Sequence, residues 1–264
     1  VSDIEYNIKI NQMGFGFRGQ SDNRAIVEAA AAYARGEAIP PGSIAAVQQI
    51  LENEIEARNI EYATLVGDDL RIIANANRDR RGQQFDPNGL VGTVLQNPRQ
   101  VKASAIVSWG ELSNEAPPLP AGFANQDALI RYTITPVTDP SSGRVVGALV
   151  SGDIVNGKDA IPRGAIAPFG NGYSALYQRN SEGSFDLATA LYAGDNPDLE
   201  VAASNVPLDA PTLIEQAVDN PGQEVTRRDR IDGTTYTLAA RTIEDFNGVP
   251  IAVMVRGTSE TALN

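Results

Sequence analysis

The feature that most constrains the fold is a pattern of β-hairpins that occurs twice along the chain. After Asn59, apolar and polar residues alternate with the period of a strand. Tyr62–Val66, an acidic glycine-containing turn and Leu70–Ala74 together predict a hairpin. Tyr173–Tyr177 begins a second segment with the same arrangement. The chain is therefore expected to contain two hairpin-based units.

The later strands recur in the same order. Tyr132 opens a strand whose return strand ends at Gly152, and Tyr236 opens one whose return strand ends at Gly257, at nearly the same spacing. Two such pairings in one order predict a duplicated α+β module. Glycine, proline and asparagine dominate residues 156–172, which predicts a boundary between the two copies.

Residues 1–59 have the spacing and punctuation of helices. The glycines of Met13–Gly19 predict a kink or break there. This stretch resembles Gly-x-Gly-x-x-Gly, but no strand precedes it, so it is not a dinucleotide-binding fingerprint. We therefore divide the chain into a helical stalk (1–59), a first module (60–157) and a second, smaller module (158–264).

The side-chain inventory excludes several kinds of chemistry. The 264 residues include no His and no Cys, which excludes histidine-dependent triads, thiol chemistry, disulfides and the usual zinc sites. Paired acids such as Asp68–Asp69 and Glu244–Asp245 fall in predicted turns, where carboxylates are common. We expect no enzymatic activity, no cofactor and no metal.

Charge and hydropathy limit the partners. The formal net charge is −12, and a nucleic-acid-binding surface needs clustered Lys and Arg instead. No apolar run approaches the roughly 18 residues of a membrane span. Because the chain begins at Val1 without Met, we expect a fragment from which flanking segments have been cut.

With these elements in place, the chain resembles the double CACHE sensor domains of bacterial methyl-accepting chemoreceptors and sensor histidine kinases. The segments that carry the resemblance are Ala128–Val137, Gly143–Ile154, Tyr236–Arg241 and Gly248–Gly257. The resemblance implies an α+β fold in which a long N-terminal helix supports two tandem PAS-like antiparallel sheets. It also implies a ligand in the first, membrane-distal module, membrane anchoring of the full-length protein, an extracytoplasmic (periplasmic) location and a homodimer formed through the N-terminal helix.

Asp153 is the first candidate ligand residue. Strand alternation places it on one face with Leu149 and Ser151, where a dry, unpaired carboxylate would be costly. In the amino-acid-binding members of the family that the chain resembles, an Asp at this Asp-Ile position binds the ligand's ammonium group. The alternative is that Asp153 caps the following turn or pairs with Lys158. Ser151 is a candidate because it shares this face.

Arg131 and Tyr132 are adjacent on a strand and therefore point to opposite faces. Arg131 is able to bind a carboxylate through two parallel hydrogen bonds, although a solvated strand face is the commoner place for an arginine. Tyr132 recurs as Tyr236, which favours a packing role and leaves ligand contact as the alternative.

Trp109 is the only tryptophan and is expected to close a strand before a Glu111–Pro120 loop, either as a wall of a ligand site or as a plug of the core. The basic clusters Arg78–Arg81 and Arg227–Arg230 are expected to be solvated, self-paired loops, the first with a possible role as a lid. The amino-acid signature of the family places an arginine and a second aromatic residue beside the tryptophan, whereas Ser108 and Gly110 stand there in this chain.

The prediction is thus a sensor domain that binds a small polar molecule, with an amino acid and an organic acid as the candidates. Ligand contacts are expected from Asp153, Trp109, Arg131, Tyr132 and Ser151. Three alternatives remain: the sensor domain of a histidine kinase rather than of a chemoreceptor, a sensor with an empty pocket that responds to a partner protein, and a secreted binding protein with no membrane attachment.

Overall fold

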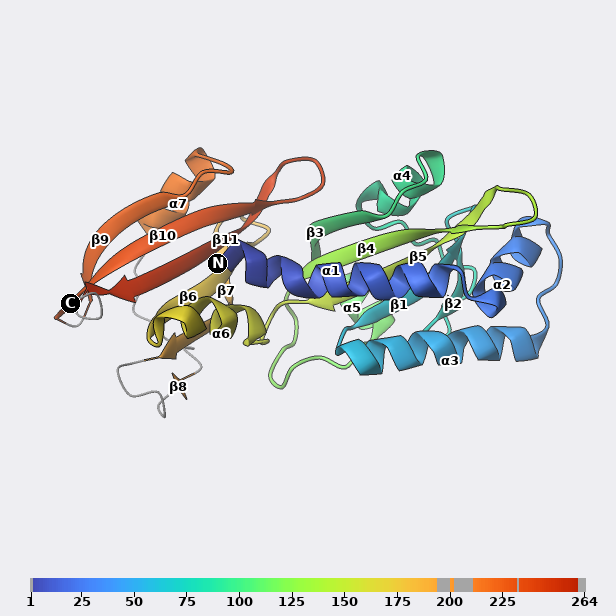
Figure 1. Ribbon diagram of the computed structural model, residues 1–264, viewed down its shortest axis with the longest axis horizontal. Coiled ribbons are helices and arrows are strands. Elements are labelled where there is room, and N and C mark those ends of the chain that lie inside the picture. The colour runs from blue at the N-terminus through green and yellow to red at the C-terminus, as the bar shows by residue number, and fades with distance from the viewer. Residues whose placement is uncertain (1, 194–199, 202–210, 232, 261–264) are drawn as a thin grey trace.

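The computed structural model describes residues 2–193, 200–201, 211–231 and 233–260. Two antiparallel sheets lie side by side along the long axis of the molecule (Figure 1). Helix α1 (Ser2–Ser21) starts beside the second sheet and runs across the first, so it contacts both. Among the described residues, no helix is long and apolar enough to span a bilayer.

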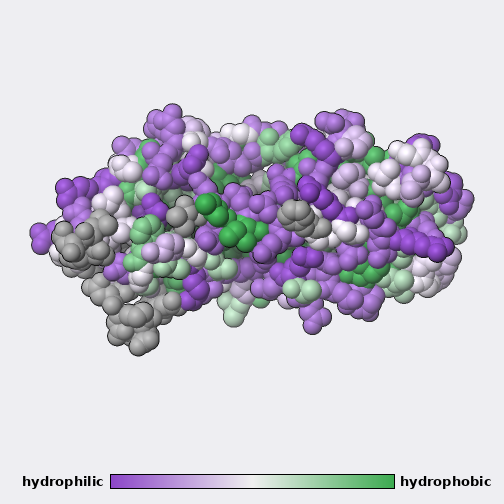
Figure 2. Space-filling model, in the orientation of Figure 1, coloured by the Kyte–Doolittle hydropathy of each residue, from purple (hydrophilic) through white to green (hydrophobic). Residues whose placement is uncertain are grey.

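Three helices cover one face of the first sheet. They are α1, α2 (Arg24–Ala34) and α3 (Pro41–Arg58), and their apolar side chains form one core with that face. The side chain of Asn23 caps α2 by accepting from the Ala25 amide at 3.0 Å. Near the start of α1, Ile4 and Ile8 remain exposed, and Figure 2 shows a hydrophobic patch over this part of the molecule.

Helix α1 runs without interruption through Met13–Gly19, so the predicted kink is wrong. The reason is packing. A Cβ atom at Gly16 would lie 2.0 Å from the guanidinium of Arg58, and one at Gly14 would lie 2.7 Å from Cε of Lys102. The glycines therefore make room for two long side chains that cross the helix, and this close approach offsets their low helix propensity.

The first sheet has the strand order β2-β1-β5-β4-β3. Its strands are β1 (Tyr62–Gly67), β2 (Ile72–Asn75), β3 (Val101–Val107), β4 (Ala128–Thr138) and β5 (Val145–Ile154). The face opposite the three helices, here called the α5 face, is covered by the 3₁₀ turn Pro87–Gly89, α4 (Leu90–Gln96) and α5 (Trp109–Glu115).

The predicted strand through Trp109 ends two residues earlier, and Trp109 instead opens α5. The side chain of Ser108 caps this helix by accepting from the Glu111 amide at 3.2 Å. Ser108 and Glu111 have the spacing of a capping box, which is the sequence signal for this helix.

The second sheet has the order β8-β7-β6-β11-β10-β9. Its strands are β6 (Gly172–Arg179), β7 (Phe185–Ala193), β8 (Glu200–Val201), β9 (Val225–Ile231), β10 (Thr234–Glu244) and β11 (Pro250–Ser259). Helix α6 (Ala160–Ile166) and the 3₁₀ turn Ala167–Phe169 connect the two sheets, and α7 (Pro211–Asp219) packs on β9, β10 and β11. The predicted loop at Arg227–Arg230 is therefore strand β9, while Asp232 of the predicted hairpin turn lies outside the described residues.

The strand orders support the predicted duplication. In both sheets the first strand of the first hairpin pairs with the last strand, the last strand pairs with the strand before it, and that strand pairs with the one before it in turn. The registers agree at the two glycines, because Gly152 lies opposite Tyr62 and Tyr132, and Gly257 lies opposite Tyr173 and Leu238. Tyr236, the predicted counterpart of Tyr132, lies opposite Ser259 instead, so Leu238 takes the place of Tyr132 in the second sheet. The two sheets are copies of one topology.

A shared core joins the two sheets and α1. It contains the buried side chains of Tyr6, Leu129, Val155, Ile161, Leu176, Ile243, Ile251, Ala252 and Met254. A buried amide network lies beside it: the Leu129 amide donates to Asn156 Oδ1 at 2.8 Å and to Gln178 Oε1 at 3.1 Å, and Gln178 Nε2 donates to the Asp127 carbonyl at 2.7 Å. The contact between the sheets thus combines buried apolar side chains with buried hydrogen bonds.

Candidate ligand-binding site

The alternation of β4 and β5 divides the five predicted ligand residues between two faces. Arg131, Ser151 and Asp153 lie on the face beneath α1, while Tyr132 belongs to the core of the α5 face and Trp109 packs at its edge. The predicted opposition of Arg131 and Tyr132 is confirmed. One small ligand is therefore unable to contact all five residues.

Asp153 is buried beneath α1 and bound by three cations. Its Oδ2 accepts from Arg131 Nε at 3.1 Å and from Nη2 of the same residue. Its Oδ1 lies 2.6 Å from Lys9 Nζ and 2.7 Å from Lys158 Nζ. Arg131 also donates to the Tyr6 carbonyl and stacks over the Tyr6 ring. The alternative prediction, that Asp153 pairs with Lys158, is confirmed.

The electrostatics of this cluster favour the ionised carboxylate. Burial alone would raise the pKa of Asp153, but the charges of Arg131, Lys158 and Lys9 outweigh it and hold the pKa below its ordinary value. Burial lowers the pKa of Lys9 and raises the pKa of Glu61, which binds Lys158 at 2.8 Å. Ser151 is buried and donates weakly to the Thr133 carbonyl at 3.4 Å.

A cavity of about 360 Å³ adjoins this cluster. It lies between α1, the end of α3, β4 and the start of α6, and Lys9, Arg58 and Arg131 contribute its positive charges. Arg58 is bound to Glu54 at 2.5 Å and Arg131 to Asp153, so these guanidinium groups already have anionic partners. A ligand role for Arg131 would place the ligand in this cavity.

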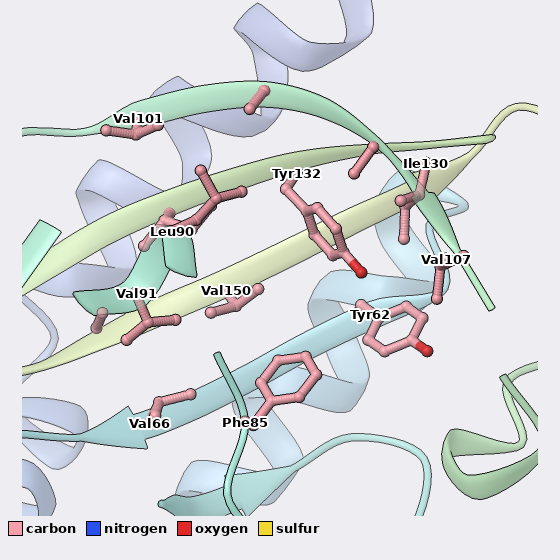
Figure 3. Close-up of a cluster of buried hydrophobic side chains, with 14 of the residues drawn as sticks. Tyr62, Val66, Phe85, Leu90, Val91, Val101, Val107, Ile130, Tyr132 and Val150 are labelled. Atoms are coloured by element: carbon pink, nitrogen blue, oxygen red, sulfur yellow. The ribbon is translucent and has the colours of Figure 1, made fainter. Parts of the chain in front are cut away.

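The α5 face carries a closely packed aromatic cluster (Figure 3). The rings of Tyr62 and Phe85 stack with centroids 6.2 Å apart, and Tyr132 meets Tyr62 edge-on at 6.4 Å. Burial raises the pKa of both tyrosines, so they stay protonated as hydrogen-bond donors. Tyr62 and Tyr132 point their hydroxyl groups toward the same end of the sheet in Figure 3.

Beside these rings, α5 contributes two carboxylates to a buried charged cluster. Arg80 Nη1 donates to Glu111 Oε1 at 2.8 Å and to Glu115 Oε1 at 2.6 Å. Asn75 and Asn77 each donate to Glu115 Oε2 at 2.8 Å. Burial opposes the charge of Arg80, but the two glutamates outweigh it and raise its pKa further. The cluster therefore attaches α5 to the chain that follows β2.

Glu111 connects this cluster to the outside. Its side chain keeps 27% of its accessible surface, whereas Glu115 is fully buried, and its Oε1 also lies 3.4 Å from the Tyr62 hydroxyl. Trp109 packs against Phe123 of the following loop at 6.4 Å, and the Trp109 amide donates to Asp127 at 2.9 Å. Helix α5 and this loop thus cover the aromatic cluster as a lid with a charged inner side.

Sequence reasoning predicted Trp109 and Tyr132 but missed Arg80, Glu111 and Glu115. The signals were present: Arg80 lies in the Arg78–Arg81 cluster, and Glu111 and Glu115 are one helical turn apart in α5. The expected solvated, self-paired loop holds for Arg81 and Asp79, which are exposed and paired, whereas Arg80 is buried and bound to Glu115. Their meeting depends on the fold, because more than thirty residues separate Arg80 from either glutamate.

No protein-family model matches the chain, and no curated protein matches its sequence. Solved structures do match. The sensor domain of the histidine kinase DctB from Vibrio cholerae has a TM-score of 0.52 at 12% identity, with 97% of this chain and 92% of that chain covered. The periplasmic domain of LuxQ from the same species has a TM-score of 0.53 at 11% identity, with 98% and 96% covered.

These matches extend over almost the whole of both chains, so both sheets and the N-terminal helix are included. The chain has the double CACHE fold, as the resemblance of its hairpins implied. The same fold occurs in the DctB sensor domain and in the LuxQ periplasmic domain.

Proposed function

We propose that the chain is an extracytoplasmic sensor domain that binds a small polar molecule in its first module and passes a conformational signal across a membrane. The observation that carries the proposal is the likeness to the DctB sensor domain and to the LuxQ periplasmic domain along nearly the full length of the chain. The chemistry agrees with it, because a chain without His or Cys is better suited to recognition than to catalysis.

The ligand site that the geometry favours is the α5 face beneath the lid. Trp109 and Phe123 provide flat apolar surface, while Glu111 and Arg80 provide one group of each charge at the lid's inner side. A ligand with both a cationic and an anionic or hydroxyl group would replace part of the Arg80–Glu111 contact as it enters. Tyr132 would lie behind it in the sheet.

The ligand roles predicted for Arg131, Asp153 and Ser151 remain predictions, and they need a different site. These residues lie beneath α1, where the 360 Å³ cavity is the nearest space. Ligand binding there would act on α1 directly. The α5 face and the cavity beneath α1 are alternative ligand sites, and the variants Glu111→Gln and Ser151→Ala distinguish them.

The experiment is a thermal-shift screen of amino acids and organic acids, followed by titration of each hit into the wild type and variants. With the ligand on the α5 face, Glu111→Gln weakens binding about tenfold and Ser151→Ala leaves it unchanged. Glu182→Gln, in an exposed turn of the second sheet, is the control. Loss of binding in Ser151→Ala alone would assign the ligand to the cavity beneath α1. A screen without any hit would contradict the proposal that the domain binds a small molecule.

A protein partner is the second candidate trigger, and one observation favours it. The aromatic cluster on the α5 face is filled by its own side chains, with Tyr62 and Leu90 fully buried. A domain whose pocket is already filled needs a trigger from outside. A protein trigger would be supported if the thermal-shift screen gives no hit and the domain captures a specific periplasmic protein.

The signal would pass through the shared core to the second sheet. A ligand that binds one arrangement of the lid better than another shifts the equilibrium between them by that difference in affinity. About 1–3 kcal/mol of coupling is enough for such control. The buried, hydrogen-bonded contact between the sheets suits transmission of a small movement.

We further propose a homodimer formed through α1. Ile4 is 64% exposed and Ile8 41% exposed, one helical turn apart near the start of α1, where Figure 2 shows a small hydrophobic patch. In the double variant Ile4→Asp with Ile8→Asp, sedimentation is expected to give a monomer, with an unchanged circular dichroism spectrum. Phe246→Asp, at an equally exposed apolar residue, is the control. A wild type that sediments as a monomer would contradict the proposal.

Membrane anchoring and the type of signalling output are tested on the sequence of the full-length gene. The proposal requires hydrophobic segments that flank this sequence on both sides in the gene. Their absence would favour the secreted binding protein. A methyl-accepting region or a kinase region in the remaining sequence would distinguish a chemoreceptor from a histidine kinase.

A further inference from the structure

Helix α6 and the start of α1 pack on the face of the second sheet opposite α7, here called the α6 face. Ile161 of α6 and Tyr6 of α1 share a core with Met254 of β11 on this face. Toward β9 and β10 the α6 face is open to solvent, because the side chains of Arg228 and Arg241 are 71% and 44% exposed. Figure 1 shows the start of α1 beside β11, at the margin of this open area.

Two arginines line one small cavity on the α6 face. Arg256 on β11 lies opposite Ala239 on β10. Arg241, two positions farther along β10, lies opposite Met254. Side chains of opposed residues share a face, so the two arginines are diagonal neighbours across this strand pair. The cavity that they line with Asp3 of α1 has a volume of about 80 Å³, well above the roughly 10–15 Å³ that one water molecule needs.

Arg256 has no acidic partner among the residues that the structure describes. Its guanidinium carbon lies over the ring of Phe169, 5.2 Å from the ring centroid. This cation–π contact holds the guanidinium group in place but satisfies none of its five N–H groups, which stay available to an acceptor. Arg228 on the same face differs, because it forms an ion pair with Glu260 at 2.5 Å.

Arg241 is only partly engaged. Its Nη1 donates to Oδ2 of Asp3 at 2.9 Å, and its Nη2 donates to the Gly222 carbonyl at 3.0 Å. A guanidinium group has five N–H groups, so three of them remain for another acceptor. The Arg241–Asp3 pair also connects the first turn of α1 to β10, so a ligand in this cavity would lie where α1 meets the second sheet.

Glu224 supplies the opposite charge. It directly precedes β9 and lines the same cavity, and no cation binds it within the described part of the chain. Strand β10 separates β9 from β11, so Glu224 and Arg256 extend from backbones about 10 Å apart, at about 4.8 Å for each strand pair. The cavity therefore has one unpaired charge of each sign at its two sides, while Arg241 and Asp3 neutralise each other between them.

We propose that this cavity binds a phosphate ester that carries a primary ammonium group. The phosphate accepts from the free N–H groups of Arg256 and Arg241, and the ammonium group binds Glu224. Because the two arginines approach from different strands, a tetrahedral phosphate suits them better than a carboxylate, whose oxygens lie in one plane. Free phosphoethanolamine and the phosphoethanolamine headgroup of a lipid share this chemistry. The site lies on the second sheet and does not depend on the ligand of the first.

The test is isothermal titration calorimetry of the whole chain, at constant ionic strength, with phosphoethanolamine, inorganic phosphate and free glycine. We expect phosphoethanolamine to bind with a Kd below about 5 mM and about threefold or more tightly than the other two, because only its charges are spaced to reach both sides. Arg256→Gln is expected to weaken this binding about tenfold. Arg228→Gln removes an exposed, paired arginine from the same face, and as the matched control it is expected to leave binding unchanged.

Glu224→Gln gives a second readout at an exposed residue outside the core. This variant loses the partner of the ammonium group, so phosphoethanolamine is expected to bind about threefold more weakly. Inorganic phosphate is expected to bind no more weakly, because a nearby negative charge has been removed. Glycerophosphoethanolamine, the soluble headgroup of the lipid, identifies the source of the ligand. Tighter binding of this diester than of phosphoethanolamine supports a lipid headgroup, and weaker binding supports the free ester.

Thermal melts show whether each variant is folded before it is titrated. The proposal is overturned if neither ester binds, if phosphate or glycine binds as tightly as phosphoethanolamine, or if Arg256→Gln and Arg228→Gln weaken binding equally. Equal weakening of phosphate and phosphoethanolamine in Glu224→Gln would also overturn it. Glu111→Gln, on the first sheet, is expected to bind phosphoethanolamine as the wild type does. Loss of binding in that variant would assign the ligand to the α5 face and contradict the proposal.

Discussion

Asp153 shows that one buried carboxylate is able to hold several elements of the fold together. Its carboxylate joins β5 to α1 through Lys9, to β4 through Arg131 and to the connection between the sheets through Lys158. Such a cluster is stable only while every member has a partner, because removing one charge leaves the others buried and uncompensated.

Replacing Asp153 with Asn is therefore expected to lower the free energy of unfolding by about 3–5 kcal/mol, measured by urea denaturation at pH 7. The matched control is Asp159→Asn. Asp159 forms an exposed pair with Arg163 at 2.6 Å, and its loss is expected to cost about 0.3–0.5 kcal/mol. Equal effects of the two substitutions would show that the buried cluster adds no stability.

The same residue predicts a dependence on pH. The folded-state pKa of Asp153 is depressed, so its stabilising contribution is present above the unfolded-state pKa of about 3.9 and is lost as the pH falls through the folded-state value. The difference in unfolding free energy between wild type and Asp153→Asn should then be constant from pH 7 to 5 and narrow below pH 4. A difference that widens on acidification would contradict the sign of the shift.

Single-residue arguments from the sequence succeeded where they depended on strand alternation. The face of Asp153, the opposition of Arg131 and Tyr132, and the pairing of Asp153 with Lys158 all follow from local spacing. The contact with Lys9 does not, because Lys9 and Asp153 lie 144 positions apart (153 − 9) in the sequence. No local rule selects which of the many distant cations will meet a buried carboxylate.

At the scale of elements, the glycines decide how closely helices and strands approach. In α1 they admit Arg58 and Lys102, and in β5 they bring neighbouring strands into contact. Composition alone predicted a break in α1, because helix propensity describes an isolated segment and not the side chains that cross it. Substitutions at Gly147 and Gly19 distinguish the effect of close packing from the effect of helix propensity.

Gly147→Ala is expected to destabilise the protein by about 1–3 kcal/mol, because the new Cβ would lie 2.5 Å from the Val66 carbonyl oxygen of the paired strand. Gly19→Ala meets nothing within 4 Å and is expected to stabilise α1 by up to about 1 kcal/mol. Both values come from chemical denaturation. Stabilisation by Gly147→Ala would mean that β1 and β5 have room that the structure does not show.

At the scale of the whole molecule, the two sheets share a core and are expected to unfold together. The buried residues between them come from α1, both sheets and α6, so neither sheet keeps its full core when the other is lost. The amide network around Gln178 adds polar groups that are satisfied only while the sheets stay in contact.

The joint unfolding of the two sheets is testable through Trp109. The fluorescence of this only tryptophan reports on the first sheet, while circular dichroism reports on both sheets. We expect the two signals to give coincident urea transitions in the wild type. Gln178→Leu is expected to lower stability by about 1–3 kcal/mol, and Gln126→Leu, an exposed residue, to change it little. Separate transitions in the wild type would mean that the sheets are independent.

The sequence by itself determined the two copies of the hairpin unit, their strand faces and the absence of thiol and imidazole chemistry. These follow from periodicity, spacing and composition, which are local or additive properties. Only the tertiary structure decided which charges meet: Arg80 with the glutamates of α5, and Asp153 with Lys9 of α1. The physical reason is that burial makes a charge costly until a partner is found, and that partner is chosen by how sheets and helices pack, not by position along the chain.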